Sequence, residues 1–364
     1  MLAAGVLAAL ARPAPAEATW RFAVVSDLHS PRRGKPSARI ARLVDQLVAL
    51  HPRFVVIEGD STNGNRRDGK ATLKKLPAWW QRLRTELAPL TEHGIPVLPL
   101  AGNHDSYLPA HRAAYMAAFH DLSALAAPLV INGPFAEDPS QIDRAPFTYS
   151  VDVDGVHLSL CHIPWRDRQP SRVDGWLARD LAAAASARYR FVFGHAPLAS
   201  VLLGEHSVYR KALGATMVAW HTDVYFAGHE HTVWDEMVAA PGGSLRQVLV
   251  GVGGSSISYG PSHLRQRAAS CRRSARLQRS CRMPNGDYPF TLVLADEQRS
   301  RHWPPVARRD LVKRPLPARP RPPPVLRWVD AHGQTFVIVE VGPEGFQIEP
   351  WAIADDGSLV RFRD

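Results

Sequence analysis

Residues 96–107 read PVLPLAGNHDSY. An apolar run ends there in a glycine, and an amide, an imidazole and a carboxylate follow in direct succession at Asn103, His104 and Asp105. Three adjacent polar side chains add nothing to a hydrophobic core, because burying them without partners costs free energy. Their position is explained if a buried strand ends here and delivers them to a functional site.

The same pattern recurs along the first 260 residues. Short apolar segments rich in Val and Phe predict buried strands at 21–27, 53–60, 95–103, 156–162, 190–195 and 223–229. Segments with helical periodicity separate them at 37–50, 71–92, 109–127, 172–187 and 207–220. This alternation predicts an α/β layered fold with largely buried strands.

Five of these strands end in a side chain that can bind a metal ion. The five residues are Asp27, Asp60, Asn103, His195 and His229. In open α/β sheets, functional groups gather outside the carboxyl ends of the strands. We therefore expect one site at that edge.

The residue types indicate a metal centre built from oxygen and nitrogen ligands. His29 and His231 each lie two positions from another candidate, which sends both side chains of the pair to the same side of an extended segment. The candidate ligands are Asp27, His29, Asp60, Asn103, His195, His229 and His231. Without cysteine, this set favours Mn, Fe, Zn, Co or Mg. Seven ligands exceed the needs of one ion, so we expect two divalent ions bridged by Asp60, with a hydroxide between them as the nucleophile.

His104 is left without a metal to bind. An imidazole at this position can protonate a departing alkoxide. Asp105 either orients that imidazole or caps a following helix, since Asp is also a good capping residue.

These blocks, in this order, resemble the calcineurin-like metallophosphoesterase superfamily over residues 21–260. The resemblance implies a four-layer αββα sandwich with the metals at the strand ends. It implies that the first metal is held by Asp27, His29, Asp60 and His231, and the second by Asp60, Asn103, His195 and His229. His104 would be the substrate-facing histidine. Purple acid phosphatases carry a metal-binding Tyr where this chain has Asn63, so a coloured ferric-tyrosinate site is not expected.

The leading hypothesis is a hydrolase that cleaves a small-molecule phosphomonoester or phosphodiester. Asn103, His104 and Arg32 are the candidate substrate contacts; Arg32 follows the first block directly and is either a phosphate contact or a solvated loop charge. Two alternatives stay open. The chain could be a nuclease or nucleotidase that grips a polyanion, or a non-catalytic binding module on the same scaffold.

The basic charge is concentrated in one segment. The formal net charge is +10, but residues 263–325 contain 15 Lys and Arg against 4 Asp and Glu, and the rest of the chain contains 29 against 30. This Arg- and Pro-rich insertion is a solvated segment, a patch for an anionic polymer or lipid, or part of the substrate rim. A basic segment of this kind could bind nucleic acid, but a small-molecule phosphate ester is the favoured partner. Residues 20–262 form the predicted metallophosphoesterase domain, and residues 326–364 are expected to complete its fold.

Residues 1–19 are expected to be a signal peptide or a disordered leader. An apolar stretch is followed by small residues that fit an A-x-A cleavage site, although the positively charged n-region is missing. We expect an exported protein, periplasmic or secreted, with a cytoplasmic location as the alternative. No stretch has the roughly 20 apolar residues of a transmembrane helix. Cys161 is expected to be a buried thiol, and Cys271 and Cys281 could pair in an exported protein.

Overall fold

The computed structural model describes residues 19–30, 37–163, 170–199, 209–231, 233–254, 327–328, 334–354 and 356–361. The predictions for the leader up to residue 18, for Arg32, for the two C-terminal cysteines and for the basic segment lie outside these residues. The boundaries of the basic insertion therefore stay a prediction.

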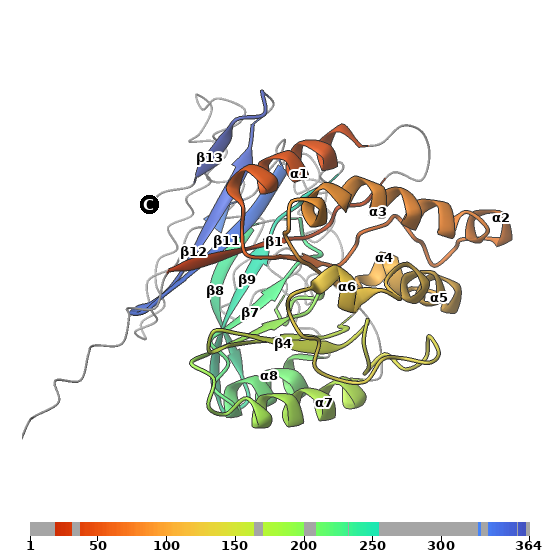
Figure 1. Ribbon diagram of the computed structural model, residues 1–364. Coiled ribbons are helices and arrows are strands. Elements are labelled where there is room, and N and C mark those ends of the chain that lie inside the picture. Colours follow the sequence, from red (N-terminus) through yellow and green to blue (C-terminus); the bar gives the residue numbers. More distant parts are fainter. Residues whose placement is uncertain are drawn as a thin grey trace, which may run out of the picture.

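Two sheets form the centre of the fold (Figure 1). The first has six strands in the order β13-β12-β11-β1-β2-β3, and the second has seven in the order β10-β8-β9-β7-β6-β5-β4. The strands of the first sheet are β1 (Trp20–Val25), β2 (Val55–Glu58), β3 (Val97–Leu100), β11 (Gln334–Gly342), β12 (Gly345–Ile353) and β13 (Leu359–Arg361). Those of the second are β4 (Tyr149–Val153), β5 (Val156–Leu160), β6 (Tyr189–Phe193), β7 (Val224–Ala227), β8 (Val233–Ala240), β9 (Gly243–Val250) and β10 (Arg327–Trp328).

Helices cover the outer face of each sheet, which gives four layers. The helices beside the first sheet are α1 (Ala38–Leu50), α2 (Lys70–Leu73), α3 (Leu76–Glu92), α4 (Asn103–Ser106), α5 (Pro109–Ala118) and α6 (Leu122–Ala126). Those beside the second are α7 (Pro170–Ala183) and α8 (Tyr209–Ala219), on the opposite side of the molecule in Figure 1. The predicted α/β fold with a four-layer sandwich is confirmed. None of the described helices is long and apolar enough to cross a membrane.

Alternation along the strands explains the layers. In β1, Phe22 and Val24 point into the core between the sheets, where Phe22 lies 6.0 Å from Phe191 of β6 between ring centroids. Ala23 and Val25 point the other way, into the core beneath α1 and α3. Because both faces of these strands are buried, their sequences read as continuous apolar runs.

All six predicted strands are present, as β1, β2, β3, β5, β6 and β7. The expected helix at 71–92 is divided into α2 and α3, and the one at 109–127 into α5 and α6. β4, β8, β9, β10 and β13 were not predicted as strands. In β8 the buried Asp235 pairs with Arg246 of β9 at 2.7 Å, and this charge interrupts the apolar pattern that identified the other strands.

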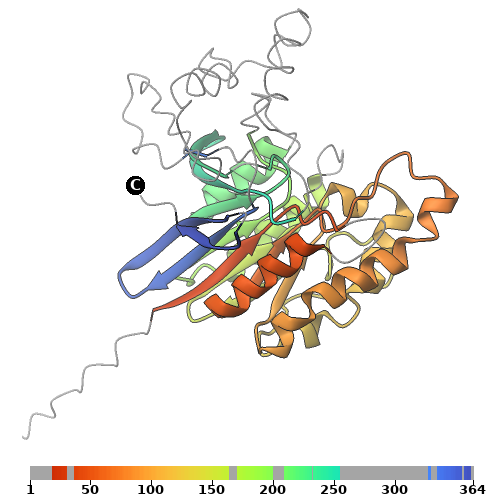
Figure 2. The same ribbon diagram turned by 90° about the horizontal axis from the view of Figure 1, so that it is seen from above.

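The end of the chain returns to the first sheet. β11 pairs antiparallel with β1, from Trp20 opposite Val341 to Val24 opposite Val337. β11 and β12 form a hairpin that turns at Gly342–Gly345, and the hairpin lies beside β1 in Figures 1 and 2.

Candidate metal centre

The predicted ligands converge at the carboxyl ends of the central strands. Three overlapping groups of three residues could each hold a metal ion. Within each group, the ligand atoms lie within 4.8 Å of one another. The groups are Asp27 with His29 and His231, His29 with Asp60 and His104, and Asp60 with His195 and His229. The metal-ligand roles of these residues stay predictions, but their side chains are close enough to hold metal ions.

The first group has the spacing of ligands around one ion. His231 Nε2 lies 3.1 Å from Asp27 Oδ1 and 3.1 Å from His29 Nε2, and the last two atoms are 3.6 Å apart. Ligand atoms about 2.0–2.1 Å from an ion in tetrahedral or octahedral geometry are about 2.8–3.4 Å from one another. All three residues are buried. The arrangement therefore fits a single divalent cation.

The other two groups share Asp60. Asp60 Oδ2 lies 3.0 Å from His195 Nε2 and 3.9 Å from His104 Nε2. Asn103 adds an amide whose Nδ2 donates to Tyr107 Oη at 2.6 Å. Its Oδ1 is buried and accepts no hydrogen bond from any residue that the structure describes. A buried acceptor without a donor is costly, and a metal ion at this position would satisfy it.

Backbone strain is concentrated in the same residues. Eight described non-glycine residues have a positive φ, and five of them are predicted ligands. These five are Asp27 (55°), His29 (45°), Asp60 (49°), His229 (70°) and His231 (50°). A left-handed conformation costs a non-glycine residue about 1–3 kcal/mol and persists where a functional site requires it. The strand ends are thus bent to aim their side chains at the site.

Glycines allow the strand ends to approach closely. A Cβ on Gly59, whose φ is +80°, would lie 2.6 Å from His195 Nδ1 and 2.7 Å from Gly102 Cα. A Cβ on Gly102 would lie 2.2 Å from the backbone nitrogen of Asp60. Because these distances are shorter than van der Waals contact, only glycine permits this packing.

Backbone carbonyls fix two of the imidazole rings. His195 Nδ1 donates to the carbonyl of Glu58 at 2.9 Å, and His104 Nδ1 donates to the carbonyl of Gly64 at 2.6 Å. Since a carbonyl oxygen can only accept, Nδ1 must carry the proton in each ring. Nε2 of His195 is then available to an ion, and Nε2 of His104 is available to a substrate.

His104 differs from the ligands in exposure. Its side chain is 30 % exposed, whereas those of Asp60 and His195 are 2 % and 0 % exposed. Its backbone nitrogen donates to Asp60 Oδ1 at 2.7 Å, which anchors it beside the centre. This exposure at the edge of the cluster is what a substrate-facing group requires.

The carboxylate of Asp105 binds the backbone around the site and not the ring of His104. Its carboxylate accepts hydrogen bonds from Ser61 N (3.0 Å), Thr62 N (2.9 Å), Thr62 Oγ1 (2.8 Å) and Gly102 N (3.1 Å). Among the described residues it is Gly64, and not Asp105, that binds the ring of His104. The prediction that Asp105 orients the imidazole is therefore wrong, because successive residues on a helix point in different directions. Asp105 instead caps α4 and holds the loop after β2.

Several contributors were not predicted. The carbonyls of Gly64 and Glu58 leave no trace in a side-chain pattern. Tyr107 could have been found, since it follows Asn103 by four residues and so shares its face of a helical turn. Asn63 lies near the site, but its Nδ2 donates to the carbonyls of His29 (2.7 Å) and Ser30 (3.1 Å) and links two loops.

Charges within the cluster shift several pKa values. Burial lowers the pKa of His195, but the carboxylates of Asp60 and Asp27 have the larger opposite effect and raise this pKa to about 10. Burial and the charge of His195 lower the pKa of His229 to about 3. Burial raises the pKa of Asp60, yet His195 and His104 lower it well below its ordinary value. Cations are therefore strongly favoured beside Asp60.

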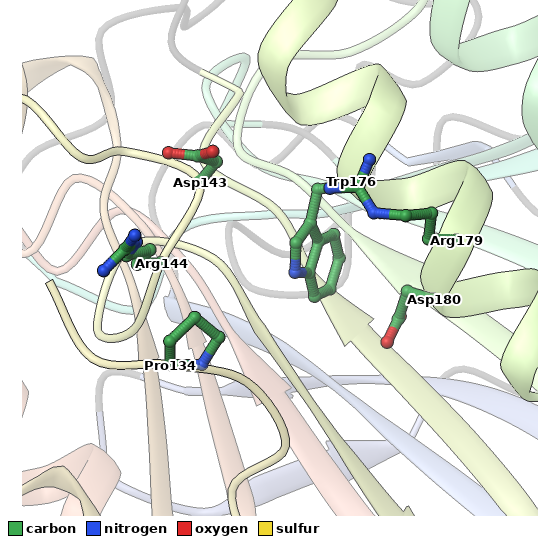
Figure 3. A pocket seen from close by; sticks show the side chains of 6 residues that line it. All are labelled: Pro134, Asp143, Arg144, Trp176, Arg179 and Asp180. Carbon is green, nitrogen blue, oxygen red and sulfur yellow. The ribbon is translucent and has the colours of Figure 1, made fainter.

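A separate cavity of about 420 Å³ lies between α7 and the segment before β4. Figure 3 shows Trp176 and Asp180 of α7 facing Pro134 and Arg144 across it. Its lining contains none of the candidate ligands, so it is distinct from the metal centre.

Comparisons with known proteins identify the family and the fold. A sequence profile described as calcineurin-like phosphoesterase matches residues 21–233. The chain belongs to the calcineurin-like phosphoesterase family. A search of curated proteins gives no significant match.

Among solved structures, a purple acid phosphatase from yellow lupin seeds has a TM-score of 0.55 at 13 % identity, over 94 % of this chain and 53 % of the lupin chain. This chain thus spans about half the length of that relative. GAP50, described as the anchor in the inner membrane complex of Plasmodium, has a TM-score of 0.50 at 13 % identity, over 95 % of this chain and 89 % of its own. At these identities the similarity establishes the fold.

Proposed function

We propose that the protein is a dinuclear metal-dependent phosphoesterase that hydrolyses a small phosphomonoester or phosphodiester. The observation that carries the proposal is the convergence of ligand-type side chains from five strand ends into overlapping groups that share His29 and Asp60. Membership of the calcineurin-like phosphoesterase family supports phosphate-ester hydrolysis as the reaction class.

The residues present fit two ions. Asp27, His29, Asp60 and His231 would hold the first, and Asp60, Asn103, His195 and His229 the second. When bound, the ions would lower the pKa of a water molecule at the site and neutralise the phosphoryl oxygens. The buried Oδ1 of Asn103 supports this assignment, because its hydrogen-bonding capacity is not used within the described residues.

His104 would supply the proton for the leaving group. Its Nδ1 proton is held on the Gly64 carbonyl, so Nε2 is the atom that can transfer a proton. Nε2 lies at the exposed edge of the cluster, where a departing oxygen could reach it. Protonation of that oxygen prevents an alkoxide from forming, which typically accelerates such reactions about 10²–10⁴-fold.

A second candidate is a non-catalytic binding module. The fold is shared with GAP50, which is described as an anchor, and this similarity favours the alternative. The full set of seven ligand-type side chains in this chain favours the enzyme. Activity measurements separate the two.

The test is hydrolysis of p-nitrophenyl phosphate and bis-p-nitrophenyl phosphate by chelated protein, reloaded with Mn, Fe, Zn, Co or Mg. We expect activity that appears only after reloading. On an alkyl phosphate such as glycerol phosphate, whose leaving oxygen needs a proton, it falls at least about a hundredfold in His104→Ala, and it falls less on the nitrophenyl esters. His120→Ala is the matched control, because His120 is exposed and its ring contacts only the carbonyl of Ala117 among described residues. Inactivity of every reloaded sample, on these esters and on nucleotides, would contradict the proposal and favour the binding module.

A further inference from the structure

We infer that Arg66, held on the ring of Tyr107 beside His104, selects phosphate esters whose leaving group carries a second anion, either a carboxylate or another phosphate. This inference rests on the proposed function, because it assigns the leaving-group side of the same site.

Tyr107 connects the rim of the site to its centre. Its hydroxyl accepts a hydrogen bond from Asn103 Nδ2 at 2.6 Å. Its ring lies 5.2 Å from the ring of His104 between centroids, with the planes at 65°. Tyr107 therefore borders both a predicted ligand and the predicted proton donor.

Arg66 is placed on the outer side of this ring. Its Cζ lies 4.8 Å from the ring centroid of Tyr107, which is within the range of a cation–π contact. The same loop supplies the Gly64 carbonyl that holds His104. The guanidinium is thus one aromatic ring away from the imidazole.

The contact with Tyr107 leaves the hydrogen-bond donors of Arg66 available. Arg66 is exposed and makes no hydrogen bond or ion pair with any residue in the described part of the chain. Stacking on the ring uses the face of the guanidinium, whereas its five N–H donors point outward from the edge. The nearby carboxylate of Asp68 is already engaged by His111 at 3.2 Å and by Asn65 N at 2.8 Å.

The geometry defines the ligand chemistry. A guanidinium binds carboxylate and phosphate through paired hydrogen bonds. The transferred phosphoryl group would lie at the metal centre, and His104 would face the leaving oxygen. An anion that reaches Arg66 from there must therefore belong to the leaving group.

The test compares esters that differ only in that second group. The substrates are 4-carboxyphenyl phosphate, its uncharged analogue 4-carbamoylphenyl phosphate, and benzene-1,4-diyl bisphosphate. If the wild type cleaves only diesters, the methyl diesters of the same phenols replace them. The variants are Arg66→Ala and, as a matched control of equal charge on the same loop, Arg67→Ala.

We expect Arg66→Ala to lower kcat/KM about tenfold or more on the carboxylate, the bisphosphate or both, mainly through KM, and less than about twofold on the carbamoyl ester. The substrate with the larger loss identifies the preferred anion. Arg67→Ala should leave kcat/KM unchanged on both the charged and the uncharged esters. Equal losses on charged and uncharged esters, or equal effects of the two variants, would overturn the inference. A wild type that cleaves none of them would instead contradict the proposed function itself.

Discussion

Two histidine–aspartate clusters in the described part of the chain use their polar atoms differently. In the cluster around His157, one ring nitrogen lies 2.8 Å from Asp152 Oδ1 and the other 2.9 Å from Asp180 Oδ2. Asp180 also accepts from Ser150 and Ser159, at 2.6 Å each. This network on β4, β5 and α7 is closed, because its members satisfy one another.

The cluster at the strand ends is not closed in this way. Nε2 atoms of His29 and His231 face each other at 3.1 Å, and Asn103 Oδ1 accepts no hydrogen bond among the described residues. Five of its residues have a positive φ. The same residue types thus serve stability where their hydrogen bonds are complete. Where they are incomplete and the backbone is strained, a bound cation would complete them.

The largest effect is expected from Asp60→Asn. Asp60 belongs to two of the three ligand groups, so its loss affects both proposed ions. We predict a loss of at least about a hundredfold in kcat of the reloaded enzyme, since even partners that only orient metal ligands typically contribute 10–100-fold. Asp180→Asn, in the closed network, is the control and should keep more than half of the activity. Similar losses in both variants would remove the distinction between the clusters.

Metal removal should separate the clusters by stability. Adding Mn or Zn at about 100 times Kd to chelated protein should raise the free energy of unfolding by about 2.7 kcal/mol per site. Urea unfolding with and without the metal measures this difference. We expect the gain to be retained in Asp180→Asn and reduced in Asp60→Asn. A gain of equal size in Asp60→Asn would place the ion elsewhere.

A smaller effect is expected from Asp68→Asn, which tests how His104 is positioned. The buried Asp68 Oδ2 accepts from Asn65 N at 2.8 Å and lies 3.2 Å from His111 Nε2, and so fixes the loop whose Gly64 carbonyl holds His104. We predict a 10- to 100-fold lower kcat with little change in KM. Asp138→Asn, an exposed aspartate, should leave kcat unchanged. An unchanged pH–rate profile and kcat in Asp68→Asn would show that the loop does not depend on this pair.

The smallest effect concerns pH and the closed network. Burial lowers the pKa of His157, but Asp180 and Asp152 raise it above its ordinary value. A raised folded-state pKa contributes stability that is fully present below the unfolded value of about 6.5 and is lost as the pH rises through the folded value. Urea unfolding of chelated wild type and His157→Gln should therefore differ by about 1–3 kcal/mol at pH 5.5 and by less at pH 9. A difference that grows with pH would contradict the assigned charge.

The sequence predicted the parts of the molecule that side-chain patterns encode. The apolar runs that end in Asp27, Asp60 and His195 identified both the strands and the edge where they meet, because both faces of those strands are buried. The sequence did not predict contacts that are made by backbone atoms. The Gly64 carbonyl that orients His104 has no side chain to signal it. Asp105 was misassigned because adjacency in sequence was taken for contact in space.

We expect the cluster at the strand ends to hold two ions per chain. The most direct measurement is the metal content of chelated and reloaded protein by inductively coupled plasma mass spectrometry, for wild type and for Asp60→Asn. We predict two divalent ions per wild-type chain and fewer in Asp60→Asn. One ion or none in the wild type, or two in both proteins, would contradict it.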